Sequence, residues 1–567
     1  MTIPAAEKES FDSTGVRCLV SCGTYTVHSD IASVVLDDDP RPLATILYEG
    51  CDGAHLAFEN YDNGALINNS SCHYSAGGTV KLSVDNDALF DKGVRIIGES
   101  SGDITNNVGL AYDRAKSEIS FTMPDQYVSV SAPSVHNFDN GICVRCDQYE
   151  APAKDSDGFY ELKNAGNFLW FAALVNDEHD HADFDERDSG ANAVMTADID
   201  LENRIFNNIG KFSTSIYSGA DDIYTGAFDG QGHTLNNFYT NGAYNRRGVF
   251  GNIKEADIGS LTVTGEIDAT QFELDSYETL LGFVCMTNNS QIHDVTSCID
   301  INSTSTAVKQ MAGGIAAAAN SSTGIKRCVN RGNITVNGNN SIAAGVIADV
   351  WSSAEVRDCA NFGAITCSSG SAAGMIALME GDRNTISNCY NCGALTGSSD
   401  TNASAIALSP ATKAEVTNCY YLDGTAPERV FTDNVTAKSA DRFAAGEVGS
   451  LLNGSLSDGT QAWYQNIDNN ASPDPYPLPD SSRGTIYRLG NTGYFSNSPD
   501  FLLGDVNLDG AVNIRDVTAI QRYTAEFRTL NNRQLAAADT DNDGGVTIAD
   551  ATLMQMYFAE FDVAWGS

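Results

Sequence analysis

Two stretches near the C-terminus place oxygen-bearing side chains at the spacing of a calcium loop. Residues 505–516 and 539–550 carry such side chains at loop positions 1, 3, 5 and 12, with glycine at position 6. These oxygens point inward, position 7 offers its carbonyl, and the glycine permits a sharp turn. We therefore expect two calcium ions, one in each loop. The predicted ligands are Asp505, Asn507, Asp509, Ala511 and Asp516 in the first loop, and Asp539, Asp541, Asp543, Gly545 and Asp550 in the second.

The two loops belong to a repeat with an offset of 34 residues. Apolar residues at helical spacing follow each loop, Val517 and Ile520 in the first copy and Ala551 and Met554 in the second. Clusters of Asp, Asn and Gly also form plain surface turns. Two matched copies followed by the same helical pattern favour calcium binding instead. Position 12 is Asp rather than the usual Glu, and no helix is evident before the first loop, so the unit departs from a full EF-hand.

This duplicated unit, over about residues 501–561, resembles a type I dockerin domain of cellulosome proteins. The resemblance implies that calcium folds the module, which then binds a cohesin on a scaffoldin. It also places the cohesin contacts just before position 12 and on the following helix. Because the two copies differ there, we expect one binding orientation to be favoured. The implied contacts are Ile514, Arg515, Gln521 and Arg522 in the first copy, and Ile548, Ala549, Gln555 and Met556 in the second.

A second repeat, with a period near 30 residues, lies upstream. β-Branched residues, glycine turns and identical stacked columns are typical of a parallel β-solenoid. A helical repeat is excluded, because the apolar positions alternate and glycine interrupts every segment. We expect apolar side chains of small or medium size in the inward column and an asparagine ladder at a turn. The columns are Cys328, Cys359, Cys389 and Cys419; Asn330, Asn361 and Asn391; and Gly332, Gly363 and Gly393.

Residues 159–470 are similar to GLUG-type repeat proteins of gut and rumen bacteria. The similarity rests on segments such as GAFDGQGHTLNNFY (226–239), GVFGNI (248–253) and AGEVGSLLNG (445–454). We expect a right-handed parallel β-helix here, with helical residues near 164–176 capping strand edges that would otherwise be unpaired.

The rest of the chain divides into smaller parts. Residues 77–86 and 118–132 alternate apolar and polar side chains, as half-buried strands do. They resemble the last strands of small extracellular β-repeat domains, so we expect one or two β-domains over residues 1–135. Residues 136–158 form a predicted linker, residues 471–500 a proline-rich linker or strap, and residues 501–567 the dockerin-like unit. The predicted fold class is mainly β, with an α-helical calcium-binding module at the C-terminus.

Cysteine and histidine clusters have a sharper and a plainer interpretation. Cys143 and Cys146 form a CxxC near His136, but no second CxxC completes a zinc site. A zinc knuckle or redox pair is the sharper interpretation, and a local disulfide or remnant hairpin is the plainer one. Residues 177–188 place two histidines among seven carboxylates, either a metal site or a solvated insertion. The four cysteines of the solenoid column occupy packing positions, so we expect free buried thiols there.

Residues that flank the inward cysteines should point outward. Tyr390 and Tyr420 would then lie one coil apart, either as aromatic faces for a carbohydrate or as a shield over the final coils. Arg327 and Asp358 would be neighbours on adjacent coils, which predicts a surface ion pair. No GxSxG, HExxH or Walker sequence occurs. We therefore expect a surface that binds glycan or protein. The alternatives are a polysaccharide lyase or glycoside hydrolase on the β-helix face, and a spacer or adhesin.

Composition limits the partners. The 567 residues include 74 acidic and 33 basic side chains, a formal charge of −41. Such a surplus disfavours nucleic acid and anionic membrane surfaces. No run approaches the ~18 apolar residues of a membrane span. No signal peptide is evident in residues 1–10. The dockerin resemblance nevertheless favours a mature extracellular or cell-surface component of a cellulosome. The expected partner is a cohesin, and plant or host polysaccharide is the second candidate.

Overall fold

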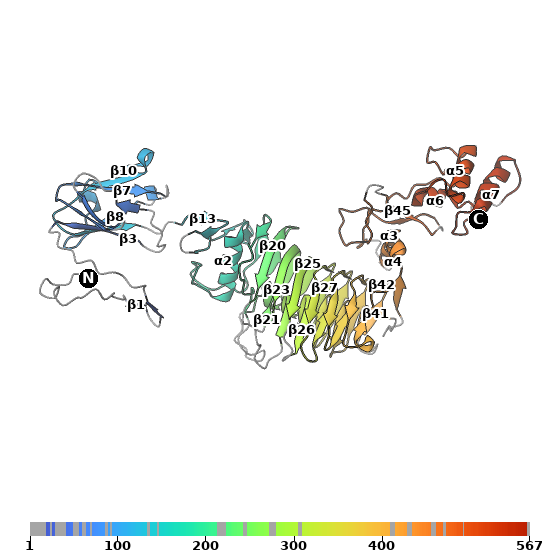
Figure 1. The fold of residues 1–567 in the computed structure, drawn as a ribbon, viewed down its shortest axis with the longest axis horizontal. Helices are drawn as coiled ribbons and strands as arrows, with labels where there is room; N and C mark the ends of the chain where they lie inside the picture. The colour runs from blue at the N-terminus through green and yellow to red at the C-terminus, as the bar shows by residue number, and fades with distance from the viewer. Residues whose placement is uncertain are drawn as a thin grey trace. The chain divides into compact units, whose positions relative to one another are not determined.

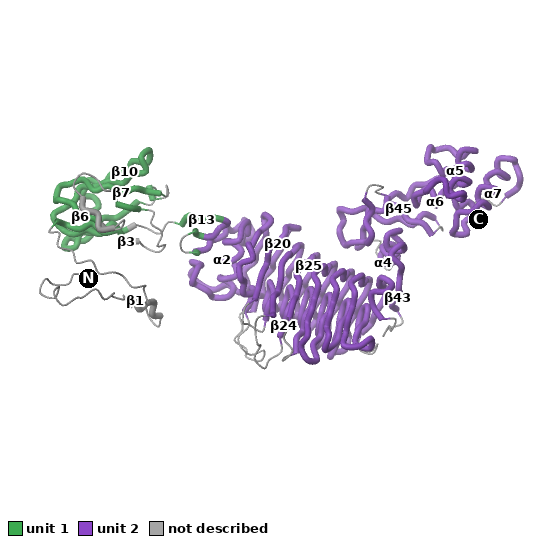
Figure 2. Tube along the Cα trace, in the orientation of Figure 1, with its two compact units in different colours: residues 1–139, 143–147 green, residues 140–142, 148–567 purple. Residues whose placement is uncertain are grey.

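The protein is described from a computed structural model. It forms two compact units, residues 1–139 with 143–147 and residues 140–142 with 148–567 (Figure 2). None of the described helices is long and apolar enough to cross a membrane. The described residues are 19–22, 25–28, 41–48, 56–58, 64–68, 71–85, 89–90, 93–132, 136–144, 147–211, 223–241, 246–270, 279–303, 309–408, 414–427, 434–454, 461–468, 472–490 and 493–563.

The first unit contains two small sheets that share one apolar core. Strand order is β5-β6-β3-β12-β8-β9 in one sheet and β10-β11-β7-β4 in the other. The alternating segments predicted as strands are β7, β11 and β12, and Val80 and Leu82 of β7 are buried as the alternation requires. A hairpin of β1 and β2 precedes the sheets. The strands are β1 (Leu19–Cys22), β2 (Tyr25–His28), β3 (Leu43–Tyr48), β4 (Leu56–Phe58), β5 (Gly64–Asn68), β6 (Ser71–Tyr74), β7 (Thr79–Val84), β8 (Arg95–Gly98), β9 (Gly102–Asp103), β10 (Ala111–Asp113), β11 (Glu118–Thr122) and β12 (Val128–Ala132).

The predicted β-solenoid is confirmed in the second unit, where successive coils add parallel strands to a long sheet (Figure 1). After the antiparallel pair β15–β16, its pairings are parallel, and β23 and β25 align Leu261 with Val295 as the repeat predicts. The strands are β15 (Ala153–Lys154), β16 (Tyr160–Leu162), β17 (Ala193–Met195), β18 (Ile199–Asp200), β19 (Ala227–Asp229), β20 (Thr234–Thr240), β23 (Asp257–Asp268), β25 (Gln291–Ser303), β27 (Thr323–Lys326), β28 (Val329–Asn330), β29 (Ile334–Val336), β32 (Ala354–Arg357), β33 (Ala360–Asn361), β34 (Ile365–Cys367), β37 (Asn384–Ser387), β38 (Tyr390–Asn391), β39 (Leu395–Thr396), β41 (Ala414–Thr417), β42 (Cys419–Leu422) and β43 (Val435–Lys438).

A second parallel sheet, the bent sheet, forms another face of the solenoid. In its later coils each strand is divided into two arms, as where Gly345 and Val346 separate β30 from β31. Side chains on both sides of the bent sheet are buried, so its strands show no apolar–polar alternation. Its strands are β21 (Arg246–Arg247), β22 (Phe250–Lys254), β24 (Thr279–Asn288), β26 (Gln310–Asn320), β30 (Ile342–Ala344), β31 (Ile347–Val350), β35 (Ser371–Ala373), β36 (Ile376–Met379) and β40 (Ala403–Ser404).

Each coil of the long sheet turns a corner at a residue in the left-handed conformation. The residue that precedes the inward column has φ between 51° and 57° in six successive coils. Asp and Asn tolerate this conformation better than other non-glycine residues, which explains their frequency there. The corner then directs the next side chain into the apolar interior. The six corner residues are Ser260, Asp294, Arg327, Asp358, Asn388 and Asn418.

The asparagine column forms the expected ladder. Asn330 donates from Nδ2 to Oδ1 of Asn361 at 2.8 Å, and Asn361 donates in the same way to Asn391 at 2.7 Å. Each of the three also donates to the carbonyl of the glycine two residues later. A Cβ on Gly363 would lie 1.9 Å from the carbonyl oxygen of Gly332. The glycine column is therefore required by the close stacking of the coils.

Helices cover both ends of the solenoid. Helix α2 (Ala165–Asn176) is the predicted cap: it starts at Asn164, whose side chain accepts from the backbone N–H of Asn167, and it is buried throughout (Figure 1). At the other end, α3 (Ala440–Ala444) and α4 (Glu447–Asn453) pack with Trp463 on the final coils. Short pairs β13 (Phe138–Asp139) with β14 (Ile142–Cys143) and β44 (Tyr487–Arg488) with β45 (Phe495–Ser496) lie outside the two large sheets.

The C-terminal part is helical, as predicted. Helices α5 (Ile514–Thr524) and α7 (Ile548–Phe558) follow the two predicted calcium loops, and α6 (Asn532–Ala538) leads into the second. Val517 and Ile520 of α5 pack with Ala551 and Met554 of α7 in one apolar core. The helical spacing seen in the sequence therefore marks the contact between the two copies.

Candidate functional sites

The two predicted calcium loops are each closed by the helix that follows. In both copies the aspartate at position 12 is the third residue of the helix and completes a capping box. Asp516 accepts from the N–H of Asn513 at 2.8 Å, and Asp550 accepts from that of Thr547 at 2.8 Å. Each carboxylate is buried and tied to the start of its helix, which fixes its position in the loop.

The first loop is held in shape by its own backbone donors. Asp505 accepts from the N–H groups of Asp509 at 3.0 Å and Gly510 at 2.8 Å. Asp516 also accepts from the N–H of Asn507 at 3.0 Å. Gly510 has φ of 85°, the conformation for which position 6 needs glycine. These hydrogen bonds fix the carboxylates of Asp505 and Asp516 within the first loop.

The second loop repeats this geometry with one more carboxylate. Asp539 accepts from the N–H groups of Asp543 and Gly544, both at 3.1 Å. Ligand atoms of Asp539, Asp541 and Asp543 lie within 4.8 Å of one another, the one such group of three in the described part of the chain. Burial raises the pKa of Asp539 and Asp541, and repulsion from neighbouring loop carboxylates adds to the rise.

This donor set suits a hard divalent cation. Calcium takes six to eight oxygen ligands, including carboxylates and carbonyls, in flexible geometry. A bound cation would relieve the repulsion that raises the carboxylate pKa values in the second loop. The first loop has Asn507 where the second has Asp541, so it offers the same oxygens with one less negative charge.

Comparison with known families and structures identifies this region. The family model "Dockerin type I domain" matches residues 503–559. Residues 503–559 form a dockerin type I domain. Dockerin domains bind calcium and direct assembly through a cohesin. No curated protein matches the chain. Among solved structures, a "putative immunoglobulin A1 protease" from Bacteroides ovatus is 17% identical, with a TM-score of 0.41 over 57% of this chain and 93% of that one.

The residues predicted to contact a cohesin lie on the two matched helices of the dockerin. Ile514 and Ile548 are the first residues of α5 and α7, and their side chains are 59% and 57% exposed. Of the other six, Arg515, Arg522, Ala549, Gln555 and Met556 are exposed and Gln521 is half-buried. Their contact with a cohesin stays a prediction.

Two exposed aromatic residues of the dockerin were not identified from the sequence. Phe527 and Phe561 are 82% and 61% exposed, just after α5 and α7. They are separated by the same 34 residues as the calcium ligands. Extending the repeat alignment past position 19 of each copy would have found them.

The prediction that Tyr390 and Tyr420 could form an open carbohydrate platform is wrong. Both point outward from the coil, but both are buried against α3, α4 and Trp463. The hydroxyl of Tyr390 donates to the carbonyl of Pro477, in the predicted strap, and its ring lies 5.4 Å from that of Phe443. The alternative prediction, a shield over the final coils, describes what the structure contains.

The predicted ion pair between Arg327 and Asp358 is also wrong in its partner. Arg327 binds Asp294 of the preceding coil through two hydrogen bonds of 2.6 and 2.7 Å. Burial opposes ionisation of Asp294, but hydrogen bonds from Arg327 and His293 outweigh it and lower the pKa to about 2. Asp358 instead lies 3.3 Å from Nε of Arg357 and accepts from Asn388. Arg327 and Arg357 therefore each pair with an aspartate at a corner of the long sheet. We call these paired side chains the corner network.

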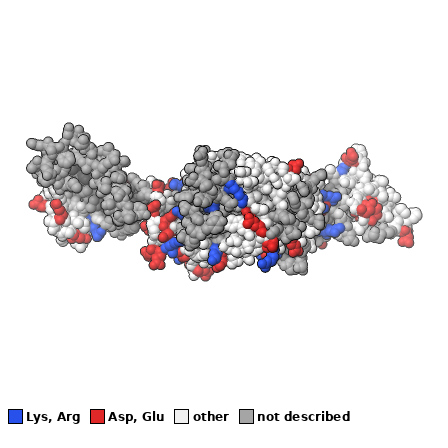
Figure 3. Space-filling model, turned by 90° about the horizontal axis from the view of Figure 1, so that it is seen from below, with Lys and Arg blue, Asp and Glu red and all other residues white. Residues whose placement is uncertain are grey.

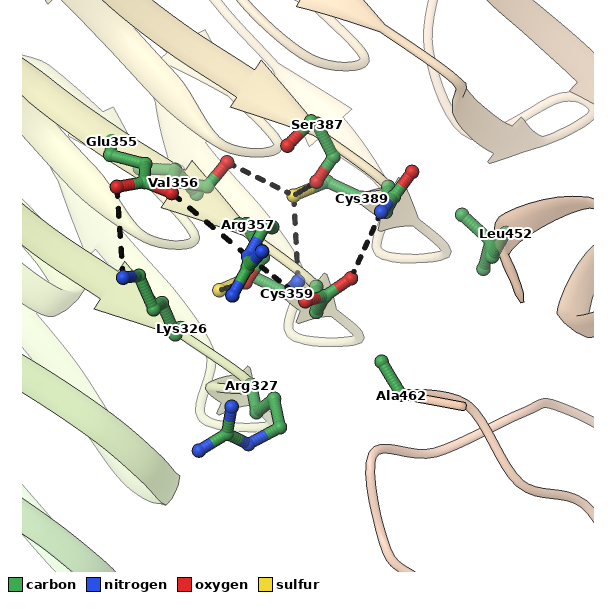
Figure 4. Close-up of polar contacts among 12 residues, drawn as sticks. Lys326, Arg327, Glu355, Val356, Arg357, Cys359, Ser387, Cys389, Leu452 and Ala462 are labelled. Atoms are coloured by element: carbon green, nitrogen blue, oxygen red, sulfur yellow. Dashed lines mark hydrogen bonds and ion pairs between the residues drawn. The ribbon is translucent and has the colours of Figure 1, made fainter. Parts of the chain in front are cut away.

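Neighbouring charges on the same face are also paired with one another. Figure 4 shows Lys326, Glu355 and Arg357, where Glu355 lies 3.7 Å from Nζ of Lys326 and 3.9 Å from Nε of Arg357. Burial raises the pKa of Asp358 to about 6. This corner holds adjacent coils together through charged and polar contacts.

The remaining cysteine and histidine predictions have simple outcomes. Cys328, Cys359, Cys389 and Cys419 are free and buried, as the packing column predicts. Cys143 is free and buried, whereas Cys146 lies outside the described residues. In residues 177–188, His179 lies 3.3 Å from Asp177 and stacks on Phe184. Among described residues, this segment forms no group of three metal-ligating side chains.

Proposed function

We propose that the protein is an extracellular component that attaches, through calcium, to a cohesin of a scaffoldin. Each loop would hold one ion, giving two calcium ions per chain. The observation that carries this proposal is the matched geometry of the two loops within a dockerin type I domain. Metal binding organises such loops because the ligands must converge on one point, so folding of the module and ion binding are coupled.

The cohesin-facing surface would be built on α5 and α7. Their exposed isoleucines, Ile514 and Ile548, supply apolar contact area at equivalent places, and the neighbouring residues differ between copies. Arg515 of the first copy corresponds to Ala549 of the second. A partner that makes an ion pair with one copy would lose it with the other, so one orientation would dominate.

The β-solenoid would be the module that the dockerin delivers, with an outer surface for a glycan or protein. Its interior is filled by apolar side chains, so any ligand must contact the outer faces. The charged side chains on the corner face already pair with one another, which leaves them occupied. This favours binding over lyase or hydrolase chemistry, which needs free carboxylates or a free base.

Capture on immobilised type I cohesins tests attachment. The full-length protein should be retained in calcium and released by EDTA. Variants I514R and I548R test orientation: with one dominant orientation, one of them should weaken binding at least tenfold and the other should leave it within twofold. Equal loss in both would contradict the preference, and retention in EDTA would contradict calcium dependence. Assay of reducing-end release from polysaccharides by the same protein checks the enzymatic alternative.

A further inference from the structure

The outer side of the bent sheet forms a trough. Side chains from the two arms of each strand meet in one apolar cluster that is separate from the solenoid core. Both arms contribute to this cluster on the side away from the core, and its central members are buried. We call this side of the sheet the trough. The first arm supplies Leu280, Met311 and Ile342, and the second supplies Ala317, Ala348 and Ala377.

The trough contains a hollow of about 450 Å³ near its later coils. This volume is in the range of small-ligand sites. Its lining combines apolar side chains with hydroxyl and amide groups. The apolar lining is Ile342, Ala377, Leu378, Met379 and Leu408; the polar lining includes Asn340, Ser341, Ser369, Ser371, Ser398, Thr401 and Asn402.

The polar lining repeats with the coils. Three successive coils supply it: Asn340 and Ser341, then Ser369 and Ser371, then Ser398, Thr401 and Asn402. Neighbouring parallel strands lie ~4.8 Å apart, so these groups extend across three coils. A ligand with several hydroxyl groups, laid across the coils, would meet hydroxyl or amide groups on each of them.

The hollow has little net charge. Lys309 is the one charged residue among the described residues that line it. Its Nζ lies 3.9 Å from a carboxylate oxygen of Asp349, which is 1% exposed and stands between Ala318 and Leu378 in register. The carboxylate offsets the ammonium charge, so the site does not favour an anionic ligand over a neutral one. The face seen in Figure 3 likewise carries acidic and basic groups in small separate clusters.

We infer that the hollow in the trough binds a neutral glycan chain lying across the later coils. Leu378 and Leu408, the partly exposed apolar residues of the lining, would take the C–H faces of the sugar rings, and the hydroxyl and amide groups would hydrogen-bond to the sugar hydroxyls. This inference deepens, and rests on, the proposed role of the solenoid as a ligand-binding module. It does not depend on the dockerin.

Native gel electrophoresis of the full-length protein, in calcium, tests the inference. The gels contain soluble mixed-linkage β-glucan, arabinoxylan or galactomannan; polygalacturonate is the acidic comparison and gelatin the polypeptide comparison. The variant S369W fills the hollow, and S368W is its matched control, because Ser368 is exposed next to Ser369 but does not line the hollow. At least one neutral polysaccharide should retard the wild type, and S369W should raise the apparent Kd at least tenfold while S368W leaves it within twofold.

Each other outcome overturns the inference. Retardation only by polygalacturonate would contradict a neutral ligand, and retardation only by gelatin would show a polypeptide site. Unchanged binding in S369W, or no retardation by any neutral polysaccharide, would place no such ligand in the trough. Cohesin capture by the same preparations separates this failure from failure of the attachment function. If S369W loses the circular dichroism of the wild type, T401A and N340A take its place, with an expected loss of at least threefold each.

Discussion

The solenoid and the dockerin are both built from repeats, but the contacts that recur in each copy differ. In the solenoid they join neighbouring copies, and in the dockerin they lie within one copy. Cys328 and Cys359 are 31 residues apart, and Asp505 and Asp539 are 34 apart. In the solenoid, the conserved Asn361 bonds to its counterparts in the neighbouring copies. In the dockerin, the conserved Asp505 bonds to N–H groups of its own loop. Damage to one solenoid copy should therefore break hydrogen bonds to its neighbours, whereas damage to one calcium loop should first break hydrogen bonds within that loop.

The largest effect on the solenoid should come from G363A. The added Cβ would lie 1.9 Å from the carbonyl oxygen of Gly332, which backbone stacking holds in place. We expect a loss of more than about 3 kcal/mol in solenoid stability, because overpacking against backbone forces coils apart. Differential scanning calorimetry would show a lower solenoid transition with the dockerin transition unmoved. G493A is the control, since nothing lies within 4 Å of its new Cβ. If the solenoid of G363A unfolded at the same temperature as that of G493A, close stacking of the coils would not be what requires glycine at position 363.

A smaller loss should follow from N361A, which breaks the ladder between copies. It removes the bonds to Gly363 and Asn391 and leaves the buried Nδ2 of Asn330 without that acceptor. We expect a cost of about 2–3 kcal/mol in the free energy of unfolding. N333A is the matched control: Asn333 also bonds between coils but is exposed, so its loss should stay below about 1 kcal/mol. Similar costs for the two would show that burial of the ladder is unimportant.

The corner network should make solenoid stability depend on pH. Burial raises the pKa of Asp358 from 3.8 to about 6, so the folded state binds a proton more tightly than the unfolded state. The contribution of Asp358 to solenoid stability should be greatest below pH 3.8 and should fall as the pH rises through 6. D358N should remove the part of this slope that comes from Asp358 and stabilise the solenoid by about 2 kcal/mol at pH 7. His293 of the same network, whose pKa is also raised, contributes the rest. Calorimetry from pH 4.5 to 7.5 measures the slope, with D423N as an exposed control. The account would be contradicted if the wild type and D423N gained stability between pH 4.5 and 6.5 while D358N did not. Asp358 would then stabilise the solenoid in its ionised form.

The smallest effect should distinguish the two calcium loops. Asp541 of the second loop corresponds to Asn507 of the first. D541N keeps an oxygen ligand but removes one charge, so we expect about tenfold weaker binding at the second loop, or ~1.4 kcal/mol. Isothermal titration with calcium should show two classes of site in the wild type and nearly one class in the variant. If the wild-type protein and D541N show the same two classes of site, the number of carboxylates does not set the difference in calcium affinity between the loops.

The sequence was most informative where a physical requirement recurs in every copy. Inward cysteines, ladder asparagines and the glycines that permit close stacking could be aligned by period alone, and so could the calcium ligands. Asp and Asn recur at the corner because the left-handed conformation favours them. Such requirements are local, so they leave a regular trace in the chain.

The failures concern contacts made by distant or non-repeating segments. Tyr390 does point out of its coil, but the strap that covers it is 87 residues away. Arg327 has an acidic neighbour on each side along the axis, and only the geometry shows that it binds Asp294. The trough lies on strands that are buried on both sides, so no alternation marks its outer residues.

The most direct test of calcium-dependent attachment is cohesin binding by the double variant D505A/D539A. Both aspartates stand at position 1 and hold the first turn of their loops through two N–H groups each. Titration of an immobilised type I cohesin in saturating calcium should give tight binding by the wild-type protein and none by the variant, while calorimetry shows an intact solenoid in both. Undiminished binding by the double variant would contradict the account.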